Sequence, residues 1–180
     1  MTDEELMLHA QRDDETAFYR LYKRWEKSVF RYVKFFIKSP DEAEDILQEA
    51  FLSIYRNKSR YTVQAKFGTY LFSVVRSKCI DFQRNQKPEE SIESVDEIRA
   101  VQSTPNVDRI LAKDIHRDFI NYLDSFPEAQ RSALYLRDME QLTYDEIAEV
   151  LSLPLGTVKS YIHRGRESAY SHIRQRYDEV

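Results

Sequence analysis

The chain has 180 residues, a net charge of −4, 42% hydrophobic residues, three glycines, five prolines and one cysteine. This length allows one mid-sized domain or two small ones, and the scarce glycine and the three-to-four spacing of apolar residues predict an all-α fold. A single cysteine excludes an internal disulfide and a cysteine-based zinc site. No apolar run approaches the length of a transmembrane helix, and the acidic start MTDEELM is unlike a signal peptide. We therefore expect a cytoplasmic protein without membrane insertion.

The N-terminal half contains a series of helix start signals. A short helix is expected over residues 2–11, and Asp13 or Asp14 can cap a long helix that runs to about Lys38. The aromatic and aliphatic residues of this long helix recur at helical spacing, which is typical of packing against a core. Ser39-Pro40 then supplies a serine cap and a proline at the first helical position, so a third helix is predicted to follow.

The third predicted helix, DEAEDILQEAFLSIYRN, has an apolar and a polar side. Its apolar residues recur at helical spacing and are expected to be buried. The other side exposes acids and an amide, among them Asp45, Gln48 and Glu49. Taken alone this is a solvated helix face, but the spacing also suits docking of a basic partner helix.

Positive charge is concentrated over residues 54–87, where eight basic residues accompany a single acid. Periodicity lapses over residues 57–68, and a further helix is expected over about 69–86. Cations can track phosphates while aromatic rings stack on unpaired bases, so this segment suits single-stranded DNA. For Phe67 and Tyr70 the alternative, a place in the core, stays open. The candidate contacts are Arg60, Tyr61, Lys66, Phe67, Arg76, Lys78 and Arg84.

The following segment, over about 88–106, is acidic and has few apolar residues. It reads as a flexible linker between two small helical domains, residues 1–87 and 107–180. Because phosphate neutralisation supplies most duplex affinity, basic regions separated by acidic residues should bind free DNA weakly. We therefore expect the protein to need a partner.

Residues 142–167 have the pattern of a helix-turn-helix. Thr143 and Glu146 have the spacing of a capping box, in which each side chain accepts the backbone N–H of the other residue. Pro154 then ends the first helix, because proline cannot continue it. At Ser152, where such turns often have glycine, a positive φ would strain the turn mildly.

A second helix is expected to begin near Gly156 or Thr157. In this motif the second helix enters the major groove, where its early residues read base edges. The alternative is an ordinary helix pair with a solvated basic face. The candidate DNA contacts are Thr157, Lys159, Ser160, His163, Arg164 and Arg166.

In this order the parts resemble the extracytoplasmic-function group of bacterial sigma factors, over nearly the whole chain. The family's region 2.1 to 2.2, which docks on the clamp coiled coil of the largest polymerase subunit, is similar to DEAEDILQEAFLSIYRN. Its region 2.3 to 2.4, which opens and reads the minus-ten element, is similar to FGTYLFSVVRSKCIDFQR. Region 4, whose second helix reads the minus-thirty-five element, resembles FPEAQRSALYLRDMEQLTYDEIAEVLSLPLGTVKSYIHRGRE.

The resemblance implies a protein that binds RNA polymerase core and directs promoter-specific initiation. Asp45, Gln48 and Glu49 would contact the clamp coiled coil, with the polymerase flap as a second docking point. Residues 60–67 would capture an unpaired base of the minus-ten element, and the helix-turn-helix would bind minus-thirty-five duplex. The expected partners are polymerase core, promoter DNA and an anti-sigma factor. No catalytic residue, cofactor or metal is implied.

Two other classes of protein remain as alternatives. A stand-alone helix-turn-helix repressor or activator would have one DNA surface and a dimer or effector domain, whereas this chain has two separated basic regions. A recombinase or transposase needs a positioned nucleophile or a metal-binding carboxylate set. Asp41, Glu44 and Asp45 are close in sequence, but they lie where a helix start favours acids anyway. We therefore expect that the protein is not an enzyme.

Overall fold

The computed structural model describes residues 1–86 and 118–177, and within these ranges the regular structure is helical, without strands. This confirms the predicted all-α fold. The C-terminal part begins with a helical stretch over residues 118–123. The labelled elements are α1 (Asp3–Gln11), α2 (Glu15–Phe36), α3 (Pro40–Arg56), the 3-10 turn η1 (Lys58–Arg60), α4 (Phe67–Asn85), α6 (Glu128–Asp138), α7 (Tyr144–Leu151) and α8 (Leu155–Tyr177).

The helices begin where the sequence supplies side-chain acceptors for their first free amides. The Asp14 carboxylate accepts the N–H of Ala17 at 3.0 Å, at the start of α2. The Ser39 hydroxyl accepts the N–H of Glu42 at 3.4 Å, and Pro40 occupies the first turn of α3. These local bonds satisfy donors that have no partner within the helix. The predicted caps at Asp14 and Ser39 are therefore confirmed.

Aromatic side chains from α2 hold the N-terminal helices together. Trp25 contacts Phe72 of α4 edge to face, with ring centroids 5.9 Å apart. At the start of α4, a Cβ atom on Gly68 would lie only 2.8 Å from the Trp25 ring, so glycine allows this close approach. On the α3 side, Tyr22 meets Phe51 at 5.0 Å. The long helix α2 is thus the shared support of α3 and α4.

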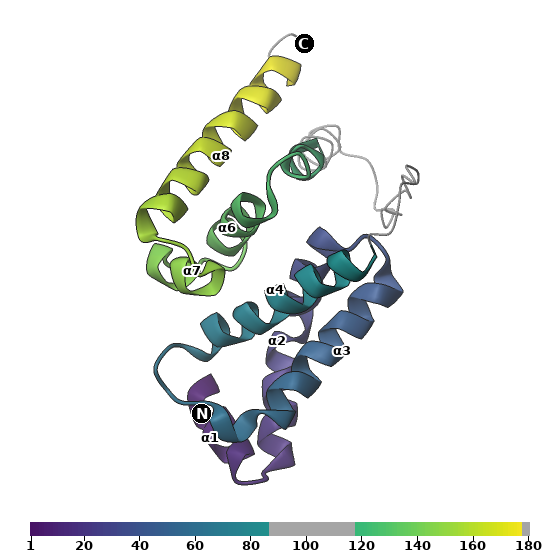
Figure 1. Cartoon of the computed structure of the whole chain (residues 1–180), viewed down its shortest axis with the longest axis vertical. Helices are drawn as coiled ribbons and strands as arrows, with labels where there is room; N and C mark the ends of the chain where they lie inside the picture. The colour runs from purple at the N-terminus through teal and green to yellow at the C-terminus, as the bar shows by residue number, and fades with distance from the viewer. Residues whose placement is uncertain (87–117, 178–180) are drawn as a thin grey trace, which may run out of the picture.

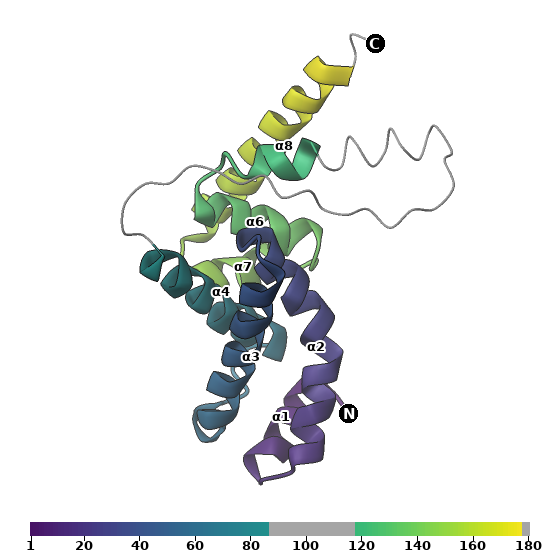
Figure 2. The ribbon, with the colours of Figure 1, turned by 90° about the vertical axis from the view of Figure 1, so that its right-hand side faces the viewer.

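The C-terminal helices pack directly on the N-terminal ones, and α4 lies between α2 and α3 on one side and α7 on the other (Figures 1 and 2). The fully buried Tyr32 of α2 lies with its hydroxyl 3.0 Å from the hydroxyl of Ser132 in α6. The rings of Tyr32 and Phe35 contact Tyr135 at 5.3 and 4.9 Å. The two groups of helices therefore share one continuous core.

Some helix boundaries differ by a few residues from those predicted. Helix α4 begins at Phe67, earlier than expected, because a carboxylate of α1 accepts the first amide of the helix. Helix α8 begins at Leu155, directly after Pro154, whose carbonyl accepts the N–H of Val158 at 3.2 Å. The predicted linker over 88–106 lies outside the described residues.

None of the helices in the described ranges is long and apolar enough to cross a membrane. Across the same ranges, no group of three or more histidine, cysteine and acidic side chains is arranged to hold a metal ion.

Candidate nucleic-acid interface

The helix-turn-helix is formed by α7 and α8. The Thr143 hydroxyl accepts the N–H of Glu146 at 3.2 Å, and the Glu146 carboxylate accepts the N–H of Thr143 at 2.7 Å. This confirms the predicted capping box. Ser152 ends α7 in the left-handed region, with φ 52° and ψ 44°. The strained turn anticipated at this serine is thus present.

Helix α8 is held against the other C-terminal helices by its apolar side. Val158 and Ile162, four residues apart, are 0% and 1% exposed. Farther along, Gly165 lies against α6, and a Cβ atom there would lie 2.6 Å from Leu134. The sequence analysis missed this glycine, although a glycine within a helical pattern is itself a signal of close packing.

The predicted contact residues of α8 do not all have the same surroundings. Lys159, His163 and Arg164 are exposed, and the Arg164 guanidinium donates to the Ser160 hydroxyl at 2.6 and 2.9 Å. Thr157 and Ser160 are half-buried on the same helix. Arg166 is exposed as well, but its guanidinium pairs with Asp138 at the end of α6, where the Nε to Oδ2 distance is 3.4 Å. Lys159, His163 and Arg164 are here named the free basic face of α8, because Arg164 and His163 have their partners, Ser160 and Glu167, on the same helix; the Nε2 atom of His163 lies 3.5 Å from Oε2 of Glu167.

A second candidate interface lies between η1 and α4. It is a pocket of about 280 Å³ lined by Arg60, Tyr61, Thr62, Gln64, Ala65, Tyr70, Ser73 and Glu149. Tyr61 and Tyr70 contact each other at 5.4 Å. Burial, together with Glu4 and Asp3, raises the pKa of Tyr61 to about 12, so its hydroxyl stays neutral. The pocket thus combines an arginine, two tyrosines and several hydrogen-bonding groups, which suits a nucleobase.

The predicted docking residues Asp45, Gln48 and Glu49 are all exposed on one side of α3. Beside them, between α2 and α3, lies a largely apolar groove of about 510 Å³. Its wall includes Gln48 and two exposed apolar side chains, Tyr19 at 59% and Leu52 at 49%. The sequence analysis missed Tyr19 and Leu52, although both fall outside the buried side of their helices. The polar face and the groove together form a continuous surface that suits a partner with both basic and apolar side chains.

Both halves of the chain match family models: Sigma-70 region 2 over residues 21–89 and Sigma-70, region 4 over residues 116–168. The ECF RNA polymerase sigma factor SigW of Bacillus subtilis is 28% identical, and the match covers 91% of this chain and 92% of SigW. The ECF RNA polymerase sigma-E factor of Escherichia coli K12 is also 28% identical, over 93% and 92% of the two chains. The chain belongs to the ECF sigma factors. This confirms the family resemblance found in the sequence motifs.

Two solved structures, one of them of a named sigma factor, have the same fold. CnrH, solved in complex with the cytosolic domain of CnrY, gives a TM-score of 0.74 at 17% identity. The match covers 96% of this chain and 97% of the CnrH chain. The sigma factor RpoE from Bartonella quintana, solved with the anti-sigma factor NepR, gives 0.69 at 19% identity and covers 86% and 94%. The region 2 match includes most of α2 together with α3 and α4, and the region 4 match includes α6, α7 and the first part of α8. In this ECF sigma factor we therefore call α1–α4 the region 2 side and α6–α8 the region 4 side.

The minus-ten candidates of this ECF sigma factor do not form a single surface. Arg60 lies at the pocket, whereas Lys78 and Arg84 line a different hollow beside α3, where Lys78 pairs with Glu49 at 2.7 Å. Arg76 points toward region 4. Its guanidinium binds the Glu128 carboxylate through two bonds of 2.9 and 2.6 Å.

The aromatic candidates are less accessible than a stacking surface would be. Phe67 is 0% exposed and contacts Trp25, so it belongs to the core and cannot stack on a base in this arrangement. This corrects its assignment as a DNA contact and settles the alternative in favour of packing. Tyr61 is 7% exposed, and Tyr70 is half-buried. At the pocket, Tyr61 therefore offers a ligand little of its surface, and Tyr70 offers part of it.

Region 4 also covers part of the region 2 surface. Lys66 pairs with Glu146 of α7 at 2.8 Å, and Glu149 of the same helix lines the pocket. Glu146 and Glu128 thus neutralise Lys66 and Arg76, two of the predicted minus-ten contacts. In this arrangement the first helix of the helix-turn-helix therefore covers the start of α4.

Proposed function

We propose that the protein is a cytoplasmic sigma factor that binds RNA polymerase core and directs promoter-specific transcription initiation, without catalysing a reaction itself. One observation carries this proposal: a single chain combines a helix-turn-helix with a free basic face and, in its other half, a base-sized pocket of arginine and tyrosine. A stand-alone repressor would need only the first of these. The two domains would comprise residues 1–87 and 107–180.

The proposed division of work follows from the chemistry of each surface. The free basic face of α8, with Thr157 and Ser160 beside it, would bind the major groove of the minus-thirty-five element. The exposed face of α3 would dock on the clamp coiled coil of polymerase, and region 4 on the flap. Anti-sigma partners of the kind named for solved relatives would compete for such surfaces.

The segment from Arg60 to Phe67, here named the capture loop, would hold an unpaired base of the minus-ten element. Flipping a base out of the stack costs a few kcal/mol, which stacking and hydrogen bonds in the adjoining pocket can offset. Arg60, Lys66, Lys78 and Arg84 would track phosphates, and Arg76 would do so after its release from Glu128. Phe67 would support the loop from the core.

The proposal is tested by transcription in vitro with bacterial core polymerase, a pool of promoter fragments, and this protein added or withheld. Transcripts that start at defined sites only when the protein is present are expected, and their upstream sequences would give both promoter elements. Binding of a palindromic duplex by a stable dimer, without assembly on core polymerase, would instead favour the repressor.

A further inference from the structure

Helix α1 contacts the capture loop at both of its ends. Near the first end, the side-chain amide of Gln11 donates to the carbonyl oxygens of Lys58 and Tyr61, both at 2.7 Å. An ion pair between Asp13 and Lys58, with 2.7 Å between Oδ1 and Nζ, lies beside these bonds. One amide group therefore bridges the start of η1 and the residue that follows it, where the chain enters the loop.

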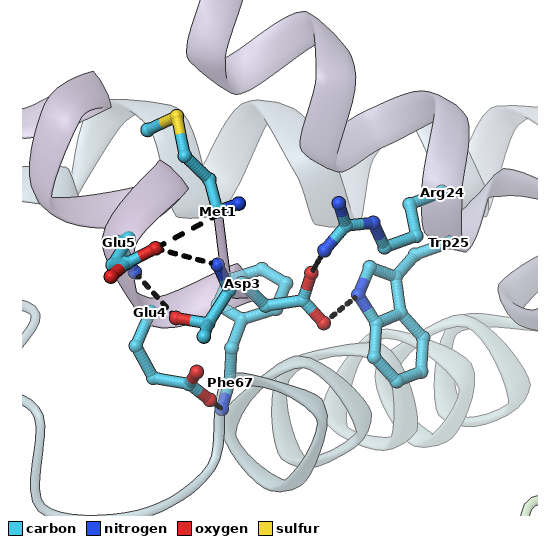
Figure 3. Close-up of polar contacts among 8 residues, drawn as sticks. Met1, Asp3, Glu4, Glu5, Arg24, Trp25 and Phe67 are labelled. Atoms are coloured by element: carbon cyan, nitrogen blue, oxygen red, sulfur yellow. Dashed lines mark hydrogen bonds and ion pairs between the residues drawn. The ribbon is translucent and has the colours of Figure 1, made fainter.

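At the second end, α4 has no capping side chain of its own. Its N-cap residue is Lys66, which makes no side-chain hydrogen bond to the helix. The Glu4 carboxylate of α1 accepts the N–H of Phe67 at 2.8 Å instead (Figure 3). This bond lowers the pKa of the Glu4 carboxyl, which keeps the group charged at the positive end of the α4 dipole.

Glu4 and Gln11 are seven residues apart, which corresponds to about two helical turns, so they lie on the same side of α1. Their separation along the helix is roughly 10 Å and is fixed by the helix itself. Between the two held ends, Thr62, Val63 and Gln64 are exposed. The loop tip is thus a short span whose two attachment points are set by one rigid element.

Helix α1 is itself firmly attached to α2. Leu6 and Met7 are 2% and 0% exposed in the core. Asp3 pairs with Arg24 and also accepts the indole N–H of Trp25 at 2.9 Å (Figure 3). The same Trp25 ring supports the first turn of α4 at Gly68. Because α1 is fixed by the core, it in turn fixes the two ends of the capture loop.

We propose that Glu4 and Gln11 are positioning residues for base capture: they hold the capture loop over its pocket in the shape that receives an unpaired base. This inference rests on the proposed function and extends it to a helix outside the basic segment. Neither residue need touch DNA. Their contribution is to reduce the loss of conformational freedom when the loop closes on a base.

The test uses the full chain assembled with polymerase core and a fluorescent single-stranded oligonucleotide that carries the minus-ten sequence found by in vitro transcription. Abasic sites are placed at each position in turn. For the wild type, an abasic site at one position should weaken binding of the oligonucleotide by about tenfold or more, because a stacked base contributes on that scale. This loss of affinity is here named the abasic penalty. The double variant Glu4→Ala with Gln11→Ala should bind the intact strand about tenfold more weakly than the wild type does. An abasic site at the same position should then reduce its affinity little further.

Two further variants separate positioning from folding. Glu4→Gln keeps an oxygen that can accept the Phe67 N–H and should recover most of the abasic penalty. Glu5→Gln is the matched control, because the partners of the Glu5 carboxylate among the described residues are Thr2 and the N-terminus, and it should behave as wild type.

The outcomes are distinguishable. A full abasic penalty in the double variant, or in Gln11→Ala alone if the double variant does not fold, would overturn the role of α1 while leaving the sigma function intact. A wild-type holoenzyme without any abasic penalty would overturn base capture and this inference with it. Failure of the wild type to assemble on core would remove the proposed function itself.

Discussion

At the scale of single residues, the contact between Glu4 and Phe67 predicts a pH dependence. The hydrogen bond from the Phe67 N–H lowers the pKa of the Glu4 carboxyl below its ordinary value of 4.5. A group with a lowered pKa in the folded state stabilises the protein fully above its unfolded pKa, and this contribution is lost as the pH falls through the folded pKa. The difference in unfolding free energy between wild type and Glu4→Gln should therefore be larger at pH 7 than at pH 4. Urea unfolding at both values measures it, and equal differences would contradict it.

Lys159 is the simplest test of the α8 face. It is exposed, and no hydrogen bond or ion pair is evident for its ammonium group among the described residues. If it contacts a phosphate, Lys159→Ala should weaken holoenzyme binding to a minus-thirty-five duplex and reduce the slope of log affinity against log salt by about one. Titrations at several salt concentrations measure the slope. Arg20→Ala, on the exposed side of α2, is the control and should leave it unchanged.

At the scale of elements, the turn between α7 and α8 stores strain at Ser152. A non-glycine residue in the left-handed region is disfavoured, and Ser152 has φ 52°. Ser152→Gly should raise the free energy of unfolding by about 0.5–1 kcal/mol, measured by urea titration. The matched change Ser171→Gly, at an exposed position within α8, should lower it by about 0.5–1 kcal/mol. Loss of stability at position 152 would show that the serine side chain contributes more than the strain costs.

The exposed face of α3 predicts an effect on polymerase assembly. Asp45 is exposed and Glu49 is already paired with Lys78, so Asp45→Lys is the cleaner change. It should weaken binding to polymerase core by about tenfold without changing the unfolding free energy by more than about 0.5 kcal/mol. Competition for core against the wild type measures this. Glu167→Lys, on α8, is a charge-matched control, and normal assembly by Asp45→Lys would return α3 to a solvated helix face.

The helices themselves could be predicted because their signals are local. The capping box at Thr143 and the serine-proline start at Ser39 satisfy backbone donors within three residues, so each can be recognised without knowledge of the fold. The start of α4 could not be predicted in this way. Its acceptor is Glu4, which is 63 residues away in the sequence. Contacts of that separation depend on the packing of α1, which no local pattern specifies.

At the scale of the whole molecule, the sequence predicted two helical parts but not their contact. Arg76 was expected to face DNA because it lies in a basic segment. The local sequence is the same whether or not an acid from another helix pairs with it. Only the packing of α6 on α2 and α4 brings Glu128 to it. Phe67 shows the same limit, because a ring in a loop can be buried or exposed with the same local sequence. The sequence therefore identified candidate site residues by their chemical type, but only the fold shows which of them are accessible.

The packing of region 4 on region 2 predicts that promoter binding requires the two halves to separate. Arg76 and Glu128 form a two-bond ion pair between them, and the side chains are only 18% and 28% exposed. Glu128→Gln keeps the shape of the side chain but removes its charge, and so weakens the closed arrangement while leaving Arg76 free for DNA. It should increase the affinity of the isolated protein for promoter DNA by about tenfold, equivalent to ~1.4 kcal/mol.

Small-angle scattering should show the accompanying increase in the radius of gyration of Glu128→Gln. Glu5→Gln also removes an exposed carboxylate, whose partners among the described residues are Thr2 and the N-terminus, so it should change neither scattering nor affinity. The Glu128 effect on DNA should also vanish in the holoenzyme, because docking on polymerase would already hold the halves apart. Equal DNA affinity for wild type and Glu128→Gln as isolated proteins, despite a larger radius of gyration, would mean that closure does not limit access to DNA. Weak binding by the isolated protein would then follow from its separated basic regions alone.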